Sequence, residues 1–396
     1  MKKKPTTYER RGVSAQKRDV HEATKNLDKG LFPGAFCKIH ADPDSPHYCR
    51  ILHPDTGGTK ASLAWLTWKT TGNLDAVRGI GIDAAVMNTE DVGCVGAVKN
   101  LLLSQTISKN TFIVPGEVVK TIIQSTNEFC KMLCQWGCEC ELACGETASV
   151  GDNVRALEVG SSVSVRMKKK YVIDASHMSP GNFLVGFSST GQAMWEHPWG
   201  ENSGIGDNGL TNARHDSLCP SYRKFTETFA PQMRRGLVYR GKYKLTDQLP
   251  QDPRFTIAGA LLSPTRTYLP LIRKILQEVG HRHIRGIIHC TGGGQTKIAK
   301  FGAHGCRFVI HSPFDIPPVF QMLHEVSGLS WKEMYETYNM GWRLVMAVPD
   351  KKVAEDCIDI SHQHCVDAQI VGEVRSRLGP GPNKVVIHSP HGTLRY

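Results

Sequence analysis

Four glycine-rich stretches carry side chains that could bind phosphate and a metal ion. They are 55–60 ("DTGGTK"), 81–91 ("GIDAAVMNTED"), 144–152 ("CGETASVGD") and 289–294 ("HCTGGG"). Glycine lets a ligand approach the backbone closely, and carboxylate oxygens are the ligands that Mg²⁺ prefers. Asp55 and Lys60 could hold Mg²⁺ and phosphate together, although a plain surface turn has the same composition. The stretches therefore predict a site for a phosphorylated ligand.

Three acidic residues, Asp83, Glu90 and Asp91, stand in a run of small apolar residues that is typical of a tightly packed helix. Burying a carboxylate is costly unless it meets a cation or hydrogen-bond donors. The alternative for Glu90 is a side chain that faces solvent. His289 ends an apolar strand and precedes three glycines, so it is either a proton carrier at the mouth of a cleft or a hydrogen-bonded core residue.

A cluster of thiols within "CKMLCQWGCECELAC" consists of Cys130, Cys134, Cys138, Cys140 and Cys144. Common zinc sites use CxxC pairs on turns, whereas the spacings here are CxxxC and CxC. The first two thiols are one helical turn apart, and the next two fall on one face of a strand. Free cysteine is among the most buried residue types. We therefore expect these thiols to pack in the core rather than bind a metal.

The formal net charge is +11, with basic residues in short clusters at 2–4, 10–11, 168–170 and 234–235. A nucleic-acid-binding protein would concentrate such residues on one element, with aromatic residues between them. A generally basic surface, which attracts phosphorylated small molecules, is the simpler interpretation. The sequence shows neither a secretory leader nor an apolar run of about 20 residues, and its 13 cysteines form no disulfide framework. We expect a cytoplasmic protein that binds no membrane.

Neither a P-loop, nor a Rossmann GxGxxG pattern, nor a GxSxG elbow is present. Apolar spacing predicts helices over 15–30 (after Ser14 as N-cap), 79–97, 116–136 and 263–280. Strands are predicted over 110–116, 138–144, 162–167 and 171–176, and strands and helices continue to alternate in the second half. This mixture indicates an α/β or α+β fold. A turn cluster at 176–182 predicts domains 1–178 and 179–396.

These stretches, in this order, resemble the aminoimidazole ribonucleotide synthetase family, also called phosphoribosylformylglycinamidine cyclo-ligase. The family pattern runs DGVGTK, GIDxVAMxxND, GGETAEMPG, SSG…SNG, L(L/A)xPTRIY, HxTGGG and FNxGxGM. To the stretches quoted above, the chain adds "SSTG" (188–191), "DNGLTNAR" (207–214), "LLSPTRTY" (261–268) and "YNMGWRLVMAVP" (338–349).

The chain also departs from the family pattern, and so resembles a divergent, longer branch. Thr56 and Cys144 replace family glycines, and Glu90 replaces an asparagine. An extra segment, 192–207, stands where the family has a few residues that include a histidine, which His197 could replace.

The resemblance implies an enzyme that converts formylglycinamidine ribonucleotide to 5-aminoimidazole ribonucleotide in purine biosynthesis, with ATP and Mg²⁺. It implies two α/β domains, with 1–178 binding ATP and Mg²⁺ and 179–396 binding the substrate. The N-terminal sheets of two subunits pair into a barrel in the family, which implies a homodimer.

Residue roles follow from the same resemblance, position by position. Catalysis is assigned to His289, Lys60 and Glu146. ATP binding is assigned to Lys25, Asp55, Gly57, Gly58, Thr59, Lys60, Asp91, Gly145 and Thr147, with Asp55 and Asp91 as the Mg²⁺ ligands. Substrate binding is assigned to Ser188, Ser189, Asn208, Gly209, Thr211, Arg214, Thr291, Gly292 and Gly293.

Other functions stay open. The same scaffold serves thiamine-monophosphate kinase, selenophosphate synthetase and a hydrogenase-maturation dehydratase. A selenophosphate synthetase would carry a cysteine in its N-terminal glycine-rich loop, and Cys37 follows "GLFPGAF" here. "PTRTY" and "HCTGGG" favour the purine enzyme. A non-catalytic metal- or nucleic-acid-binding protein is the alternative from a different class; we expect no nucleic-acid partner.

Overall fold

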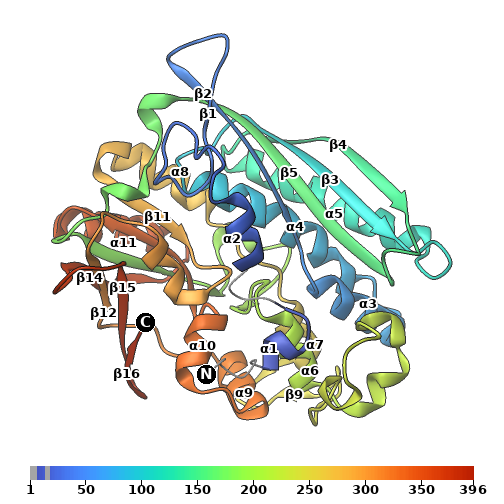
Figure 1. Cartoon of the computed structure of the whole chain (residues 1–396). Coiled ribbons are helices and arrows are strands. Elements are labelled where there is room, and N and C mark those ends of the chain that lie inside the picture. The colour runs from blue at the N-terminus through green and yellow to red at the C-terminus, as the bar shows by residue number, and fades with distance from the viewer. Residues whose placement is uncertain (1–6, 14–17) are drawn as a thin grey trace.

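The protein is built on two β-sheets, one from each half of the chain (Figure 1). The computed structural model describes residues 7–13 and 18–396. The first sheet has the strand order β1-β2-β5-β3-β4, and the second has the order β11-β13-β6-β14-β12-β15-β16. Strands and helices alternate in both halves, which confirms the predicted α/β (α+β) class. None of the helices in the described part is long and apolar enough to span a bilayer.

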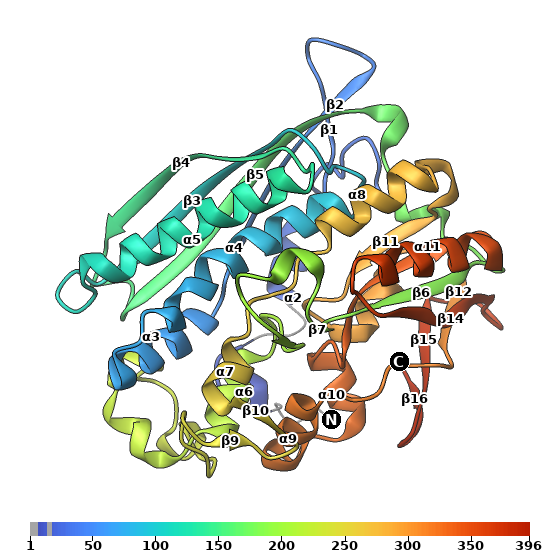
Figure 2. The same cartoon turned by 180° about the vertical axis from the view of Figure 1, so that it is seen from behind.

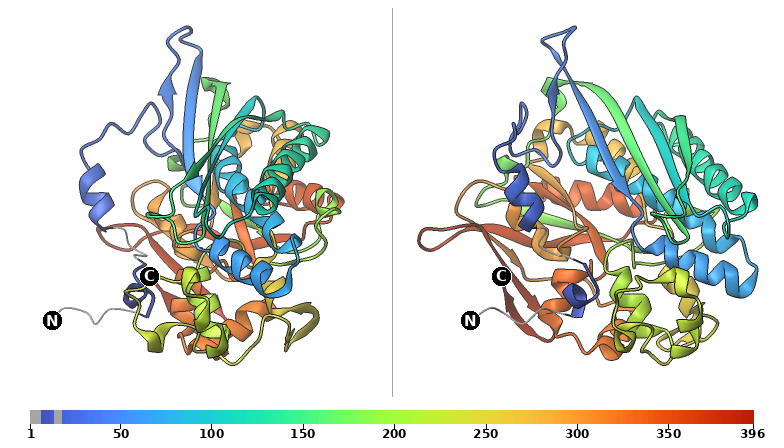
Figure 3. Two further views of the ribbon diagram at one scale, coloured as in Figure 1. Left: turned by 90° about the vertical axis from the view of Figure 1, so that its right-hand side faces the viewer. Right: turned by 45° about the vertical axis from the view of Figure 1, so that its right-hand side comes forward.

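The five-stranded sheet has a covered face and an exposed face. Its strands are β1 (His40–Ala41), β2 (Tyr48–Thr56), β3 (Leu101–Lys109), β4 (Cys140–Ser149) and β5 (Leu157–Lys168); only β3 and β4 run parallel. Helices α4 (Asp75–Gly93) and α5 (Gly116–Gln135) lie along one face, beside α3 (Lys60–Thr71) (Figure 3). Successive side chains alternate between the faces, so Ile51 is buried while Leu52 is 65% exposed. Leu102 on β3 is likewise 51% exposed.

The seven-stranded sheet carries helices on both faces. Its strands are β6 (Phe183–Ser188), β11 (Gly286–His289), β12 (Cys306–Ile310), β13 (Trp342–Val348), β14 (Ala368–Ser376), β15 (Lys384–Ser389) and β16 (Gly392–Arg395). The face toward the first sheet packs against α8 (Leu269–Glu278) and α11 (Lys351–Gln363). The opposite face packs against α6 (Leu210–Ser217), α7 (Ile257–Leu262), α9 (Pro318–Ser327) and α10 (Trp331–Thr337).

Smaller elements connect the two layers. They are α1 (Thr7–Arg10), α2 (Arg18–Thr24), the hairpin-like pairs β7 (Thr190–Gly191) with β8 (Asn202–Ser203) and β9 (Gln248–Leu249) with β10 (Asp252–Thr256), and several single 3₁₀ turns.

The two halves share one hydrophobic core. Val86 of α4, Leu271 and Ile275 of α8, and Phe187 and Met346 of the second sheet belong to the same buried cluster. Figure 2 shows α4 and α8 next to each other between the sheets. The predicted boundary at 178/179 falls in the connection between β5 and β6, after the 3₁₀ turns at 169–171 and 175–177. The division into domains 1–178 and 179–396 stays a prediction.

Several predicted elements are confirmed, and others are wrong for identifiable reasons. Helix 116–136 is α5, and helix 79–97 is the larger part of α4. Residues 110–116 are not a strand, because the amides of Ile113 and Val114 turn back onto the carbonyl of Asn110. The strand is β3, where a run of three leucines at 101–103 hides the alternation.

Two further predictions need correction. Residues 171–176 form no strand: 3₁₀ turns at 169–171 and 175–177 enclose a short extended stretch with an isolated bridge from Asp174 to Ala35. Helix 263–280 begins only at Leu269. Residues 263–268 stay extended because their backbone is bonded by side chains from other elements, as described below. In the N-terminal helix, α2 ends at Thr24, and the proposed cap Ser14 lies outside the described residues.

The cysteine cluster packs largely as small apolar residues do. Cys130 on α5 and Cys140 on β4 are buried with their Sγ atoms 3.6 Å apart, and Cys138 is also buried. Burial raises the pKa of Cys138 to about 12, which opposes formation of the thiolate that binds metals. Cys134 and Cys144 are exposed.

We expect that replacing Cys130, Cys134, Cys138 and Cys140 together by alanine or serine will not change the metal content. Cys130, Cys138 and Cys140 are buried packing groups and Cys134 is exposed, so the loss should be a modest decrease in stability. Elemental analysis of the purified wild type and variant checks the prediction. One equivalent of zinc in the wild type that disappears in the variant would contradict it.

Candidate functional site

The centre of the candidate site is a buried histidine–carboxylate pair that joins the two halves. His289, at the end of β11, has its Nδ1 2.9 Å from Oδ1 of Asp91 in the last turn of α4. The second carboxylate oxygen of Asp91 lies 3.4 Å from Nε2 of His53 on β2. His289 is fully buried, and its Nε2 has no hydrogen-bond partner among the described residues. Asp91 thus orients the imidazole through Nδ1, while Nε2 is buried without a hydrogen-bond partner among the described residues.

The charges around this pair fix the protonation state of His289. Burial lowers the pKa of His289 to about 4, although Asp91 acts in the opposite direction, so the imidazole is neutral near pH 7. Burial alone would raise the pKa of Asp91, but Lys297, His289 and His53 outweigh it and hold that pKa below its usual value. An ionised Asp91 accepting from Nδ1–H leaves the lone pair on Nε2. This arrangement suits a proton acceptor.

Lys297 supplies the positive charge near Asp91. Its Nζ lies 2.7 Å from Oγ1 of Thr291 and 4.4 Å from the ring centroid of Phe36. Thr291, Gly292 and Gly293 connect His289 to the 3₁₀ turn Gly294–Lys300 that carries this lysine. The structure therefore brings the predicted residues of "HCTGGG" together with a cation that our sequence analysis missed. The available signal was a lysine three residues after the glycine run.

A second buried cluster surrounds Lys60, at the start of α3. Its Nζ lies 2.9 Å from Oδ1 of Asp83 and 2.6 Å from the carbonyl oxygen of Ser263, and both charged side chains are fully buried. Asp83 also accepts from the amide of Thr265 at 2.7 Å. In this structure Lys60 is thus bonded to the protein itself, and it links "DTGGTK" to "GIDAAVMNTED" and "LLSPTRTY".

Carboxylate oxygens without partners lie beside this cluster. Oδ2 of Asp83 and Oδ1 of Asp207 are buried and have no hydrogen-bond partner among the described residues. Burial, followed by the nearby charges of Asp83 and Asp55, raises the pKa of Asp207 well above its usual value. Among the described residues, no three acidic, histidine or cysteine side chains are arranged to hold a metal ion. A divalent cation that entered with a ligand would relieve the desolvation and repulsion of Asp83 and Asp207, whereas both oxygens of Asp91 face histidine nitrogens.

Glu90 caps the helix α8 from a distant part of the chain. Its Oε1 accepts from the hydroxyl of Thr267 and from the amides of Tyr268 and Leu269, at 3.0 and 3.2 Å for the two amides. The suggestion that Glu90 faces solvent is therefore wrong, because the side chain is completely buried among donors. Burial raises the pKa of Glu90 to about 7, although these donors and Arg343 oppose the shift.

This shift predicts a pH-dependent stability. The folded state holds the Glu90 proton more tightly than the unfolded chain, whose glutamate pKa is 4.5. The stabilisation is present below pH 4.5 and is lost as pH rises through about 7, by about 3 kcal/mol in total.

Glu90→Gln keeps an oxygen acceptor and cannot ionise, so its free energy of unfolding should lack this decline. Urea unfolding at pH 5 and pH 8 checks it, with exposed Glu158→Gln as the control. Parallel pH profiles for wild type and Glu90→Gln would contradict it.

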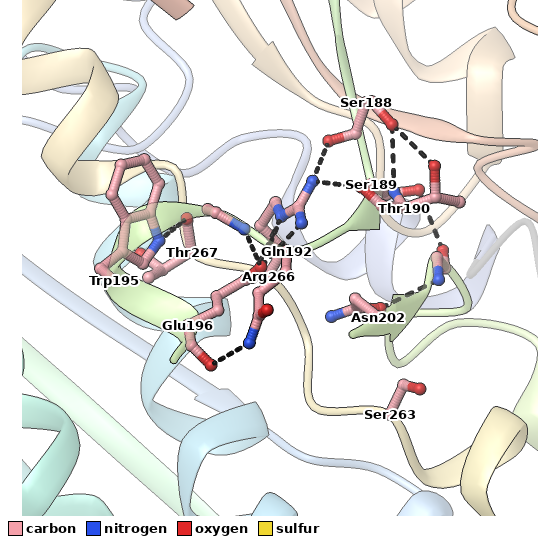
Figure 4. Close-up of polar contacts among 12 residues, drawn as sticks. Ser188, Ser189, Thr190, Gln192, Trp195, Glu196, Asn202, Ser263, Arg266 and Thr267 are labelled. Atoms are coloured by element: carbon pink, nitrogen blue, oxygen red, sulfur yellow. Dashed lines mark hydrogen bonds and ion pairs between the residues drawn. The ribbon is translucent and has the colours of Figure 1, made fainter. Parts of the chain in front are cut away.

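The extra segment 192–207 is fastened to the "PTRTY" loop by a buried ion pair (Figure 4). Nη2 of Arg266 lies 2.7 Å from Oε2 of Glu196, and both side chains are buried. Nη1 of the same arginine donates to the carbonyls of Ser188 and Thr190 at 2.9 and 2.7 Å. Arg266 therefore holds the insertion, the loop and the end of β6 in one arrangement. His197 is exposed and lies outside this network.

A buried arginine at 343 was also missed by our sequence analysis. It stands where the family pattern FNxGxGM has its last glycine, and it is only 1% exposed. Its Nη2 donates to the carbonyl oxygen of Arg266, and a Cβ at Gly206 would lie 2.4 Å from its Nη1. Its charge acts on Glu90, Asp207 and His289. The position could have been noticed as a charged residue within the apolar run "WRLVMAV".

The remaining predicted substrate residues divide into two groups. Ser188 and Ser189 are buried at the end of β6, within the second half. The hydroxyl of Thr211 lies 2.8 Å from that of Thr59, so this position connects the two halves. Arg214, in contrast, is inside α6, where it donates to the hydroxyl of Tyr239 at 3.1 Å, and burial lowers its pKa. Asn208 is half-buried.

Gly209 of the same motif has a packing reason to be glycine. Its φ is +76°, and a Cβ there would lie 2.3 Å from the ring of Tyr338. Larger residues would therefore be strained and would displace the tyrosine. Gly57 and Gly58 precede α3, and a Cβ at Gly58 would lie 3.8 Å from Oδ2 of Asp207.

Two predicted ATP-site residues and one predicted catalytic residue lie apart from this centre. Gly145, Glu146 and Thr147 are exposed on β4, the edge strand. The registers place Glu146 and Thr56 in one row, three strands apart, which corresponds to about 14 Å. Lys25 is exposed and pairs with Glu22. Within one chain, these side chains do not join the His289 and Asp83 clusters.

Comparison with known proteins agrees with this architecture. Residues 46–164 match the family model "AIR synthase related protein, N-terminal domain", and residues 255–381 match the corresponding C-terminal domain. Proteins called phosphoribosylformylglycinamidine cyclo-ligase are similar along most of the chain. The one from Methanococcus vannielii is 27% identical over 90% of this chain and 85% of its own length, and the one from Alkaliphilus metalliredigens is 26% identical over 93% and 95%.

Two solved structures share the fold at low sequence identity. The HypE–HypF complex contains a chain with a TM-score of 0.55 and 16% identity, covering 95% of this chain and 97% of that chain. Thermotoga maritima PurL complexed with ADP has a TM-score of 0.53 and 14% identity, covering 99% of this chain and 51% of that chain. The first half of the chain thus matches the N-terminal domain of the AIR synthase architecture, and the second half matches the C-terminal domain. The protein belongs to the AIR synthase related proteins.

Proposed function

We propose that the protein closes the imidazole ring of 5-aminoimidazole ribonucleotide from formylglycinamidine ribonucleotide, with ATP and Mg²⁺. The names of the similar cyclo-ligases support this substrate. The observation that carries the chemistry is the buried His289, held by Asp91 through Nδ1, whose Nε2 has no hydrogen-bond partner among the described residues. Ring closure needs a proton acceptor of this kind.

The proposed reaction has two steps. The amide oxygen of the substrate attacks the γ-phosphorus of ATP, and ADP leaves, which makes the oxygen a good leaving group. The substrate nitrogen then attacks the carbon that bears this phosphorylated oxygen. A C–N bond forms, the C–O bond breaks, and inorganic phosphate departs. Nε2 of His289 accepts the proton that the nitrogen loses, and Asp91 stabilises the resulting imidazolium.

The other residues bind and orient the two phosphorylated ligands. Mg²⁺ would be held by Asp55, Asp83 and Asp207, and it supplies charge neutralisation for the phosphates. Lys297 and the backbone of 291–293 lie beside His289 and would contact the leaving phosphate. Lys60 would act through Asp83 rather than on a phosphate directly.

We also propose a homodimer. The exposed face of the five-stranded sheet carries Leu52 and Leu102, and a second copy packed there would cover them. Glu146 and Thr147 lie on the same sheet at its edge, so a partner could bring its own copies to the ATP site.

The direct test uses the purified full chain with formylglycinamidine ribonucleotide, ATP and Mg²⁺. We expect one aminoimidazole product and one ADP for each substrate consumed, measured by chromatography and mass spectrometry. Parallel reactions with thiamine monophosphate and with selenide test the other activities of the scaffold. Turnover of either in place of the purine precursor would contradict the proposal.

A further inference from the structure

A strongly basic pocket lies on the second sheet, far from the His289 site. It has a volume of about 400 Å³, and its polar lining consists of Arg307, Arg377, Lys384, Arg395 and Tyr396. Four strand spacings separate β11, which carries His289, from β12, which carries Arg307, and this corresponds to about 19 Å. Lys384, Arg395 and Tyr396 follow the end of the C-terminal family match at 381. The pocket therefore combines Arg307 and Arg377 from within the family match with residues that follow it.

Strand register explains why the basic side chains converge. Arg307 on β12 is paired directly with Lys384 on β15, and Val386, two residues further on, is paired with Arg395 on β16. Paired residues and residues two apart point to the same face of a sheet. The opposite face of these strands carries Phe308, Val385 and Ile387, which belong to the core.

This face of β12, β15 and β16 is open because α11 covers other strands. Helix α11 contacts β6, β13 and β14, and Figure 2 shows β15 and β16 lying beyond it. Val386 forms part of the pocket floor and is only 6% exposed, although no helix named above packs on it. Its neighbours in the pocket lining are long basic side chains, whose aliphatic stems commonly cover apolar surface.

The positive charge here is not neutralised by the protein. Like charges directly opposite in a sheet are destabilising, and Arg307 faces Lys384. Within residues 7–13 and 18–396, no ion pair within 4.0 Å involves any of the four basic residues. The nearest acid on this face in the register is Glu373, and its carboxylate already accepts from Arg375 at 2.7 Å.

Unused hydrogen-bond donors point to the missing partner. Nε of Arg307, and Nε and Nη1 of Arg377, are buried and have no acceptor among the described residues. Buried N–H groups in native proteins are nearly always paired, and an unpaired one is costly. Arg377 is held in its loop at two points. Its backbone amide donates to the carbonyl of Gly305 at 2.8 Å, and its Nη1 lies so close to Gly381 that a Cβ there would be 2.3 Å away.

We propose that this pocket binds a small molecule through its phosphate group. Guanidinium groups donate parallel N–H bonds to a tetrahedral oxoanion, and such bonds would satisfy Arg307 and Arg377 while neutralising Lys384 and Arg395. The volume suits a small ligand rather than a polymer. Nucleic-acid surfaces use successive aromatic platforms, whereas the lining here has the single ring of Tyr396, whose hydroxyl donates to the carbonyl of Lys332 at 2.8 Å.

The test measures binding to the full chain by calorimetry in 0.1 M salt. The probes are inorganic phosphate, ribose 5-phosphate and a single-stranded decamer of thymidine. Arg307→Ala/Lys384→Ala removes two pocket charges, and Lys351→Ala/Lys352→Ala removes two charges on α11, where the side chains are 70% and 78% exposed. The active site is unchanged in both variants, so any difference between them reports on the pocket.

We expect at least one small phosphate probe to bind the wild type and the α11 variant equally, and the pocket variant at least tenfold more weakly. Binding of inorganic phosphate alone assigns free phosphate, and tighter binding of ribose 5-phosphate assigns a phosphorylated metabolite. Equal binding to all three proteins overturns the proposal. A pocket variant that loses binding of the decamer alone also overturns the proposal, because the surface then serves nucleic acid.

Removal of the opposed charges should leave the melting temperature of the pocket variant unchanged or raised. Arg395→Ala provides a second pocket variant with the same expectation.

Discussion

His289→Ala is expected to lower kcat for ring closure by about 100-fold or more, the usual contribution of a positioned acid–base group. The KM for ATP should change little, because the Asp55, Asp83 and Asp207 cluster does not involve this side chain. The pH profile supplies a second readout. Since the pKa of His289 is about 4, the wild-type acid limb from this group should lie near pH 4, and it should be absent in the variant.

A second buried histidine gives a matched control. His215 on α6 is also fully buried, its Nε2 also lacks a partner, and burial lowers its pKa. Its Nδ1 accepts from the amide of Tyr239 at 3.3 Å, so its role is packing. His215→Ala should reduce stability and leave kcat per folded molecule unchanged. If His289→Ala behaves in the same way, His289 is a core histidine and the proposed mechanism fails.

Lys60→Met is expected to lower the free energy of unfolding of the ligand-free protein by about 3–5 kcal/mol. The substitution leaves the buried Asp83 carboxylate with only the amide of Thr265. Urea unfolding measures the loss. Lys60→Met/Asp83→Asn removes both charges and should recover much of it, so the double-mutant cycle should give a large coupling energy.

An exposed pair serves as the control for this experiment. Lys352 and Asp356 on α11 form a pair 2.8 Å apart in which the lysine is 78% exposed. Lys352→Met should change stability little, because water screens such pairs. A Lys60→Met variant as stable as Lys352→Met would show that the buried pair carries no net stabilisation.

The sequence alone was sufficient for the fold class and for the motif residues, but not for their partners. His289 and Asp91 are 198 positions apart, and Glu90 and Tyr268 are 178 apart. Periodicity reports the face of an element on which a residue lies, not which distant element packs against it. The glycine-rich motifs therefore predicted a site, while the assignment of Asp91 to its two histidines required the structure.

Residues missed in the sequence share one property: they are single charges inside otherwise apolar or small-residue stretches. Arg343 sits in the fully buried strand β13, and Asp207 precedes a glycine-rich helix start. A lone charge has no spacing pattern, so its function depends on whether the fold buries it. Glu146 shows the converse, since its motif is recognisable but its side chain is exposed on an edge strand.

The cap that Glu90 provides for α8 bears on how the chain folds. Tyr268 at the N-cap position makes no side-chain cap, and the amide of Leu269 has one local acceptor, the hydroxyl of Thr267 at 3.2 Å. The acceptor that the amides of Tyr268 and Leu269 share comes from α4, 178 residues before Tyr268 in the chain. The start of α8 therefore has all of these acceptors only while α4 is docked against it. The two halves stabilise each other through this helix start, and separating them would take the donors away from the Glu90 carboxylate.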